Sequence, residues 1–314
     1  MKFITRWISG ILGGVLLSQG YLGSVSLAQG TLLAAHRPDE ATNRAIIECP
    51  EAPTVDIMFL YTPTVGRKYK EDGVGQKIQQ AAFEMNSALK DSGVCGRVES
   101  VLIREADNFS VLDNRVFEDY VEVRNYFNSQ YVQDLRNGSS ADLVSLLYEG
   151  NGGWADRPDP DIGNPQATSE QAYSVLGMEW LGLAGGEDVL SHEVGHNLGA
   201  SHDWETDPVR NEKYPYNKGY IASSRKWRDI MAYNTNCNPD CPKVRGYSNP
   251  RLKYNGESMG EEGGEKPADL ARLFNETIPI VAQYRNPGQQ VTSSERQAYW
   301  NSGVNRRGDI IEVE

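Results

Sequence analysis

A dense histidine pattern constrains this chain more than any other feature. Three of its four histidines lie within eleven residues, at His192, His196 and His202. Residues four apart share one face of an α-helix, so His192 and His196 can present their rings to one ion. Gly199 can adopt the left-handed backbone that ends a helix, and this turn would bring His202 to the same ion. The spacing therefore predicts a helix that stops at a tight turn, with three imidazoles around one zinc ion.

The residue after the first histidine is an acid, Glu193. Three histidine ligands leave the fourth position of zinc for water, which is typical of catalytic rather than structural sites. Zinc lowers the pKa of that water and polarises a carbonyl group, and a neighbouring carboxylate can take the water proton. We predict that Glu193 is first the general base and then the acid that protonates a leaving amine. The alternative is an ordinary helix with solvated histidines, but five fixed positions rarely coincide by chance.

The chain before this pattern alternates strand and helix signals. Compact apolar runs predict strands at residues 55–61, 98–103 and 141–148. Helical spacing of apolar residues predicts helices at 75–89 and 116–135. This βαβ pattern predicts an α/β (α+β) fold with a mostly parallel sheet.

The second half of the chain is less regular. A long surface loop is expected at 154–168, followed by a short strand at 172–178 on the edge of the sheet. The helix that carries the histidines is expected at 187–198. An irregular stretch rich in Asn, Pro, Gly and Tyr leads to a last helix at 268–284, which has Pro267 near its start.

The segment His192–Asp203 resembles the extended motif H-E-x-x-H-x-x-G-x-x-H of the metzincin zinc metalloproteases. That family adds a methionine turn beneath the zinc, and the segment 229–233 around Met231 is similar to it. Asp203 resembles the adamalysin/reprolysin branch and the bacterial peptidyl-Asp metallopeptidase family. The resemblance implies a twisted, mostly parallel sheet with the active-site helix above an irregular C-terminal subdomain. It also implies that Met231 forms an apolar floor under the histidines, with Gly199 and Asp203 supporting the site.

Tyr233 has two interpretations. It lies two residues after Met231, as in astacins and serralysins, where the tyrosine reaches the metal. By resemblance it is either a fifth zinc ligand or a hydrogen-bond donor to the oxyanion. The alternative is a tyrosine packed in the lower subdomain.

The resemblance also implies where a substrate would lie. Metzincin substrates extend along an edge strand above the zinc, and residues 172–178 are the candidate for pairing by strand addition. The segment Tyr247–Leu252 would form the wall of the pocket just past the scissile bond. Arg245 and Arg251 are nearby cations that could favour an acidic substrate side chain, although a solvated surface arginine is the favoured interpretation for each taken alone.

Four cysteines allow three disulfide pairings. We predict Cys237–Cys241, which closes a small loop, and Cys49–Cys95, whose members each precede a predicted strand. The alternative is that Cys49 caps the zinc as a thiolate latch. That would leave Cys95 unpaired, which is unusual in an exported protein.

Other features are weaker. Asp156, Asp159 and Asp161 could bind calcium as oxygen ligands, although solvated aspartates are favoured because their spacing fits no established loop. Three N-x-S/T triplets matter only if the host glycosylates; they begin at Asn108, Asn137 and Asn275.

The formal net charge is −12, and such an acidic surface repels phosphate backbones, so no nucleic-acid partner is expected.

The N-terminus is typical of a secretory signal. Lys2 and Arg6 precede a short apolar run at 7–17, and Ser26-Leu27-Ala28 is a small-x-small cleavage site. The run is shorter than a membrane span, so a cleaved signal is favoured over an anchor. We expect a secreted monomer without stable membrane insertion. The predicted organisation is a signal peptide (1–28), a short pro-segment or arm (29–53), a catalytic domain (54–286, upper 54–199 and lower 200–286) and a polar tail (287–314).

Together these features predict a secreted zinc endopeptidase in which Glu193 assists attack of zinc-bound water on peptide bonds of a protein or peptide substrate. Two alternatives stay open. One is a zinc hydrolase of a non-peptide amide, such as a cell-wall linkage. The other is a catalytically silent binding protein on the same fold, although the intact Glu193 disfavours it.

Overall fold

The computed structural model describes residues 49, 52–183, 187–237 and 240–285. The predicted signal peptide, most of the pro-segment and the polar tail lie outside these residues. Within the described part of the chain, no helix is long and apolar enough to cross a membrane.

Five strands form the main sheet, in the order β2-β1-β3-β5-β4. Their bounds are β1 Thr54–Tyr61, β2 Arg97–Glu105, β3 Leu143–Tyr148, β5 Tyr173–Gly177 and β4 Gly153–Ala155. The first four run parallel, and β4 pairs antiparallel with β5. The predicted α/β fold with a mostly parallel sheet is confirmed.

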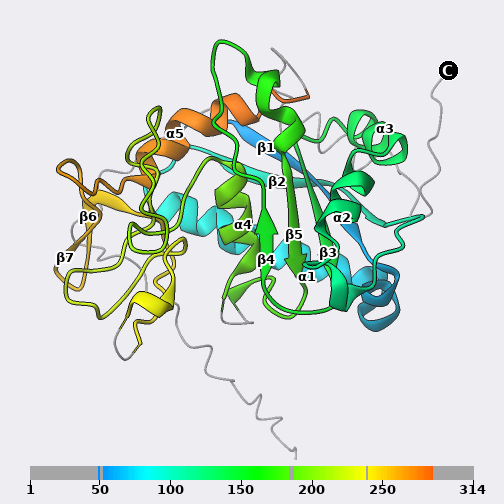
Figure 1. Ribbon diagram of the computed structural model, residues 1–314, viewed down its shortest axis with the longest axis horizontal. Helices are drawn as coiled ribbons and strands as arrows, with labels where there is room; N and C mark the ends of the chain where they lie inside the picture. The colour runs from blue at the N-terminus through cyan, green and yellow to red at the C-terminus, as the bar shows by residue number, and fades with distance from the viewer. Residues whose placement is uncertain (1–48, 50–51, 184–186, 238–239, 286–314) are drawn as a thin grey trace, which may run out of the picture. The chain divides into compact units, whose positions relative to one another are not determined.

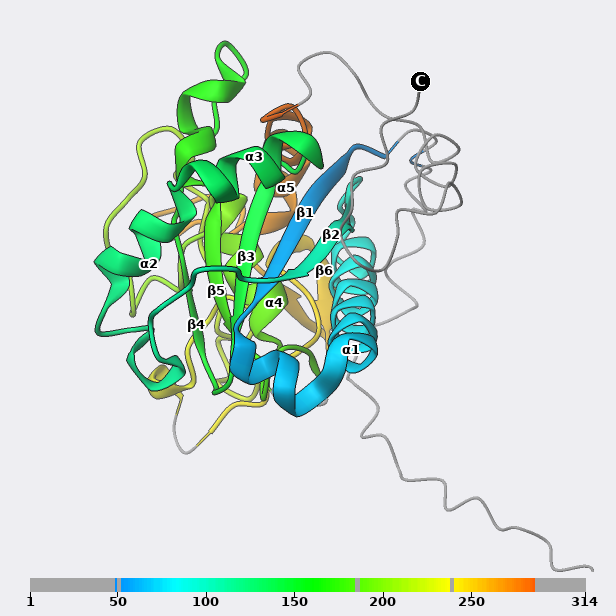
Figure 2. The same cartoon turned by 90° about the vertical axis from the view of Figure 1, so that its right-hand side faces the viewer.

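Helices cover both faces of this sheet. Alternate residues of a strand point to opposite faces, and β1 illustrates this: Ile57 and Phe59 join one buried cluster, Met58 and Leu60 the other. The first cluster includes residues of α1 (Pro63–Asp91), α4 (Val189–Asn197) and α5 (Leu270–Val281), and the second includes residues of α2 (Tyr120–Phe127) and α3 (Gln130–Gly138). Figure 2 shows α1 on the opposite side of the sheet from α2 and α3. Both faces of β1 and β3 are therefore buried, which explains why these central strands are mostly apolar, whereas the edge strand β2 is half-buried and carries charged residues.

Three predicted elements differ from the structure. The helix expected at 75–89 begins at Pro63, because Thr62 caps it by accepting a hydrogen bond from Val65 N. Lys70, with a φ of 60°, interrupts the helix, and glycines nearby obscure its apolar period. The helical region expected at 116–135 divides into α2 and α3, and Ser129 caps α3. A short helix η1 (Asp113–Arg115) precedes it.

The third difference concerns the edge of the sheet. The strand expected there at 172–178 is β5, which is internal, since β4 pairs with its outer side. β4 and a short helix η2 (Pro165–Gln171) lie in the stretch expected to be a surface loop. Three residues carry too little alternation to predict β4 from the sequence.

The rest of the chain has little regular structure. It contains a short helix η4 (Asn234–Asn236) and a two-stranded hairpin of β6 (Asn249–Tyr254) and β7 (Glu257–Met259). Asn255 and Gly256 both have positive φ at its turn, as an Asn-Gly hairpin turn requires. We call residues 52–183 and 187–199 the sheet region, and residues 200–237 and 240–285 the loop region. Figure 1 shows β6 and β7 on the far side of α4 from α2 and α3.

Both predicted disulfides are confirmed. Cys49 and Cys95 are joined with their Cα atoms 5.6 Å apart, and Cys237 and Cys241 with theirs 5.5 Å apart. The alternative in which Cys49 caps the metal as a thiolate is wrong for this structure, because its sulfur is committed to Cys95.

Candidate metal centre

Helix α4 carries two of the three histidines through the middle of the molecule. It begins after Asp188, whose carboxylate accepts a hydrogen bond from Ser191 N, and every residue from Val189 to Asn197 is buried. His192 and His196 lie one turn apart, as the spacing predicts.

A tight turn after α4 brings in the third histidine. Gly199 has a φ of +97°, which a side chain would strain, and Ala200 N donates to Gly195 O at 3.0 Å. Asn217 Nδ2 donates to the carbonyl of Gly199 at 2.9 Å. The chain therefore reverses immediately after the helix and places His202 opposite the other two rings.

The three rings converge on one point. His202 Nε2 lies 3.2 Å from His192 Nε2 and 3.0 Å from His196 Nε2. Nitrogen ligands of a tetrahedral zinc ion at 2.0–2.1 Å are roughly 3.3 Å apart, so the arrangement fits such an ion. Among the described residues, His192, His196 and His202 are the one group of histidine, cysteine or acidic side chains that lie close enough together to hold a metal ion.

Second partners orient two of the rings. His192 Nδ1 lies 2.9 Å from Ile230 O, and His196 Nδ1 lies 2.7 Å from Ala200 O. A carbonyl only accepts, so each Nδ1 carries the proton and each Nε2 keeps its lone pair for a metal. Burial also lowers the pKa of all three histidines, that of His196 to about 3. The rings are therefore neutral, as metal ligands must be.

Glu193 lies beside this group on α4 and is buried. Burial raises the pKa of its carboxyl group to about 8, and the charge of Lys243 opposes that rise. Strand β4 runs against it: a Cβ atom on Gly153 would lie 2.7 Å from Glu193 Cγ and 2.8 Å from Oε1. Only a glycine leaves room for Glu193 at this point.

Met231 lies directly beneath α4. It is fully buried, and a Cβ atom on Gly195 would lie 2.6 Å from its sulfur. Asp229 shapes the turn, since its Oδ1 accepts from Met231 N and Ala232 N and its Oδ2 accepts from Ser248 N, all at 2.9–3.0 Å. The predicted position of Met231 under the histidines agrees with this packing.

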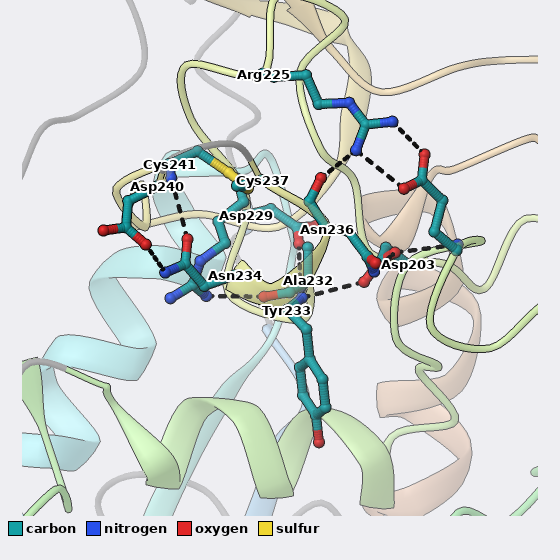
Figure 3. The surroundings of a disulfide bond; sticks show 12 residues. Asp203, Arg225, Asp229, Ala232, Tyr233, Asn234, Asn236, Cys237, Asp240 and Cys241 are labelled. Atoms are coloured by element: carbon teal, nitrogen blue, oxygen red, sulfur yellow. Dashed lines mark hydrogen bonds and ion pairs between the residues drawn. A yellow bond between two sulfur atoms is a disulfide. The ribbon is translucent and has the colours of Figure 1, made fainter.

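Asp203 connects the third histidine to the methionine turn. Its carboxylate accepts from Glu205 N and Thr206 N on its own loop and from Tyr233 N at 3.1 Å. Figure 3 shows the Tyr233 side chain pointing from this turn toward α4. Its ring centre lies 4.2 Å from that of His202, and the side chain is 41% exposed. Tyr233 therefore borders the metal site, although its part in metal binding stays a prediction.

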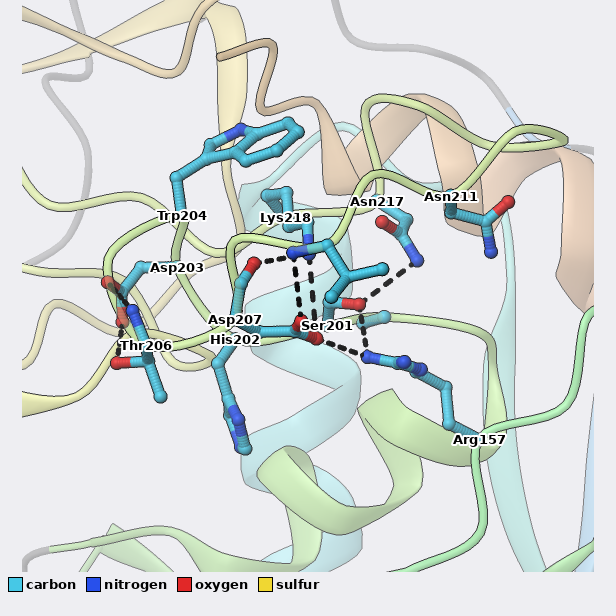
Figure 4. A network of polar contacts seen from close by, with 12 residues as sticks. Arg157, Ser201, His202, Asp203, Trp204, Thr206, Asp207, Asn211, Asn217 and Lys218 are labelled. Carbon is cyan, nitrogen blue, oxygen red and sulfur yellow. Dashed lines mark hydrogen bonds and ion pairs between the residues drawn. The ribbon is translucent and has the colours of Figure 1, made fainter.

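A buried lysine holds the His202 loop from behind (Figure 4). Lys218 is fully buried, and its ammonium donates to Asp207 O at 2.7 Å and lies 4.9 Å from the centre of the Trp204 ring. Arg157 pairs with Asp207 Oδ2 at 2.6 Å. These contacts fix residues 201–207 without regular secondary structure.

The predicted substrate-binding residues are occupied in other contacts. Tyr247 is fully buried, and its hydroxyl donates to Ser191 O at 3.0 Å. Arg251 forms two hydrogen bonds to Asp269, and Arg245 lies 3.3 Å from Asp91 Oδ2. Their contact with a substrate stays a prediction.

The three aspartates considered for calcium have separate partners. Asp156 pairs with Arg124, Asp159 accepts from Asn211, and Asp161 accepts from Gly163 N and pairs with Lys213. They do not form a cluster that could hold a metal within the described residues.

Sequence reasoning missed three residues that shape the site: Gly153, Asp229 and Lys218. Asp229 has a local signal, since an Asp two residues before a turn commonly accepts main-chain N–H groups. Gly153 and Lys218 have none, because their roles arise from contacts with residues distant in the chain.

The fold and the histidine group together are those of a metzincin-type metallopeptidase. A family model described as metallo-peptidase family M12 (Reprolysin_5) matches residues 51–244, more than half of the chain. The chain therefore belongs to metallo-peptidase family M12, which confirms the predicted class. Membership implies a metal ion, typically zinc.

Two bacterial relatives are each named peptidyl-Asp metalloendopeptidase. One, from Stenotrophomonas maltophilia (strain R551-3), is 29% identical over 220 residues, which cover 66% of this chain and 47% of that protein. The other, from Pseudomonas aeruginosa, is 28% identical over 260 residues, which cover 74% of this chain and 40% of that protein. The chain thus spans less than half the length of these relatives.

A solved structure titled "Structure of a chaperone-substrate complex" has a TM-score of 0.56 to this chain. The two are 19% identical, and the match covers 74% of this chain and 39% of that one. This likeness concerns the fold alone.

Proposed function

We propose that the chain is an exported zinc endopeptidase in which His192, His196 and His202 bind the metal and Glu193 is the general base. One observation carries the proposal: three Nε2 atoms converge within bonding range of one ion, with Glu193 on the same helix. Two imidazoles are fixed by carbonyls on their Nδ1 side, which is the usual support for histidine ligands of zinc.

Glu193 is suited to both of its proposed roles. A bound zinc ion would lower the pKa of water and polarise the substrate carbonyl. Burial raises the pKa of Glu193, which makes its carboxylate a stronger base, and a bound divalent cation beside it would keep the group ionised until it accepts the water proton. The same carboxyl group then delivers the proton to the leaving amine.

The substrate is proposed to pair with β4, in place of the strand at 172–178 favoured by the sequence. In the described part of the chain β4 ends the sheet, and β5 is its strand partner. Its free side offers main-chain groups to an extended peptide by strand addition. Because Gly153 touches Glu193, a peptide on β4 would run past the carboxylate.

The relatives' names support a substrate with an aspartate beside the cleaved bond. Export is supported by two disulfides, which persist in oxidising compartments. The predicted signal at residues 1–28 agrees with it.

The test uses purified chain and a peptide library, with chelator and after addition of zinc. We expect cleavage that chelation abolishes and zinc restores. Glu193→Gln should keep stoichiometric zinc but lose activity by about 10²–10⁴-fold, the range for a lost general base. Glu212→Gln, at an exposed position, is the matched control and should retain full activity.

Two results would overturn the proposal. One is cleavage by the zinc-loaded Glu193→Gln variant at the wild-type rate. The other is zinc bound at one equivalent with no peptide cleaved under any condition, which would favour a non-peptide amide substrate or a silent binding protein.

A further inference from the structure

Two nearly buried cations hold one carboxylate beside the first turn of α4. Lys243 Nζ lies 2.8 Å from Glu187 Oε2, and Arg228 Nη2 lies 3.4 Å from the same oxygen. The side chains of Lys243 and Arg228 are 9% and 7% exposed, whereas that of Glu187 is 41% exposed. A carboxylate at the surface thus reaches inward to two cations, in a chain whose formal net charge is −12.

Lys243 and Arg228 are also tied to the elements that hold the metal site. The Lys243 ammonium donates to Glu187 O, next to Asp188, which caps α4. Arg228 Nη1 donates to Ala232 O at 2.8 Å, in the turn whose Ile230 O orients His192. The segment that follows Lys243 is fixed against α4 and the methionine turn, because Tyr247 OH donates to Ser191 O and Ile230 N donates to Gly246 O, both at 3.0 Å.

We propose that Lys243, assisted by Arg228, determines specificity by holding the carboxylate of an acidic substrate residue beside the scissile bond. In the free chain the Glu187 carboxylate occupies that position. A substrate carboxylate would replace it on Lys243 Nζ, and the half-exposed Glu187 side chain would turn to solvent. This inference rests on the proposed endopeptidase function.

The other cations considered for this role are less suitable. Arg251 gives both terminal nitrogens to Asp269, and Arg245 pairs with Asp91. Arg228 differs in its acidic partner, because the Glu187 side chain is 41% exposed and can turn to solvent, whereas those of Asp91 and Asp269 are 23% and 4% exposed.

The experiment compares two peptides that differ only in Asp or Asn beside the cleaved bond. The zinc-loaded wild type should prefer Asp. Lys243→Met should lower the ratio of kcat/KM values for the two peptides by about tenfold or more, the usual effect of losing a hydrogen bond to a charged group. Lys253→Met, in the exposed part of β6, is the matched control and should leave the ratio unchanged.

Glu187→Gln tests the same site in the opposite direction. It removes the competing carboxylate, so KM for the Asp peptide should fall by about tenfold while the Asn peptide is little affected. A purely structural link between Glu187 and the two cations would lower stability and leave KM unchanged. If Lys243→Met does not fold, Glu187→Gln and Lys243→Arg test the role of Lys243 instead. Lys243→Arg should keep the Asp preference.

The outcomes separate this inference from the proposed function. Zinc-dependent cleavage with an Asp preference that survives in Lys243→Met but disappears in Arg245→Gln would overturn the role of Lys243 alone. Cleavage by wild type without any acidic preference would do the same. Absence of zinc-dependent cleavage in wild type would instead remove the endopeptidase function on which the inference rests.

Discussion

The sheet region and the loop region meet at the histidine triad, but different interactions stabilise them. In the sheet region, buried strands pair their backbone groups in ladders, and two apolar clusters fill the space between sheet and helices. In the loop region, outside α5 and the β6–β7 hairpin, single polar side chains satisfy much of the buried backbone. Asp229 accepts three main-chain N–H groups there, and Asp203 accepts another three. Buried backbone groups must be paired in either case.

Because of this difference, different interactions place the site residues of the two regions. His192, His196 and Glu193 are placed by α4, whose position reflects the summed burial of many apolar side chains. His202 is placed mainly by the hydrogen bonds of Asp203 and Asp207 in its loop. Met231 is placed by the hydrogen bonds of Asp229 and by its burial in the first apolar cluster. Single polar substitutions in the loop region should therefore lower the free energy of unfolding strongly. The sheet region should be more sensitive to loss of a covalent link such as the Cys49–Cys95 disulfide.

Removal of a disulfide is the change with the largest expected effect on stability. Cys49–Cys95 ties the sheet region to the residue that precedes it, at a sequence separation of 46, and Cys237–Cys241 has a separation of 4 in the loop region. In the chain-entropy model, loops of these lengths correspond to about 4 and about 2 kcal/mol. Paired Cys→Ser variants, measured by denaturant unfolding, should show this order. An equal or reversed cost would mean that the small loop has a local role beyond restricting the unfolded chain.

Asp229→Ala should destabilise the chain by about 3 kcal/mol, because it leaves three buried N–H groups without an acceptor. The variant should also bind zinc more weakly, since Ile230 O orients His192. Asp134→Ala, at an exposed position of α3, is the control and should change stability by less than about 0.5 kcal/mol.

Free energies of unfolding and zinc titrations of both variants test this expectation. A cost at Asp229 no larger than at Asp134 would show that the loop region is not stabilised by its buried carboxylates.

The same difference explains which parts of the fold were predictable. The apolar runs at 55–61 and 141–148 correspond to β1 and β3, because strands buried on both faces must be apolar. The run at 98–103 corresponds to β2, a half-buried strand at the end of the sheet. β4 has three residues and no pattern, so the edge of the sheet was assigned to β5. The hairpin of β6 and β7 was missed although Asn255-Gly256 is a strong turn signal.

For the site, local spacing predicted the convergence of His192, His196 and His202, because a helix and one glycine turn suffice to bring them together. The contacts of Gly153 with Glu193, and of Lys218 with Asp207, depend on tertiary packing. Arg245 and Arg251 looked available in the sequence, yet each has an acidic partner far away in the chain. Charge near a motif does not reveal which charges are already paired.

The pH dependence of the stability of the zinc-free chain compares the two regions at the metal site, where they meet. Burial lowers the pKa of His196 to about 3 and also lowers that of His202, which is less buried. The unfolded chain binds these protons near pH 6.5, so it takes up more protons than the folded chain between pH 6.5 and 3. Stability due to each neutral histidine is therefore present above pH 6.5 and is lost as the pH falls.

The wild type should lose up to about 1.4 kcal/mol per pH unit relative to His196→Gln in that range. Relative to His202→Gln, the loss should extend over a narrower range of pH, because the more exposed ring in the loop region protonates earlier. Denaturant unfolding of the chelated proteins from pH 7 to 4 measures both slopes. Parallel curves for wild type and His196→Gln would mean that the ring on α4 is not kept neutral by burial, and the distinction between the two regions would then fail at the metal site itself.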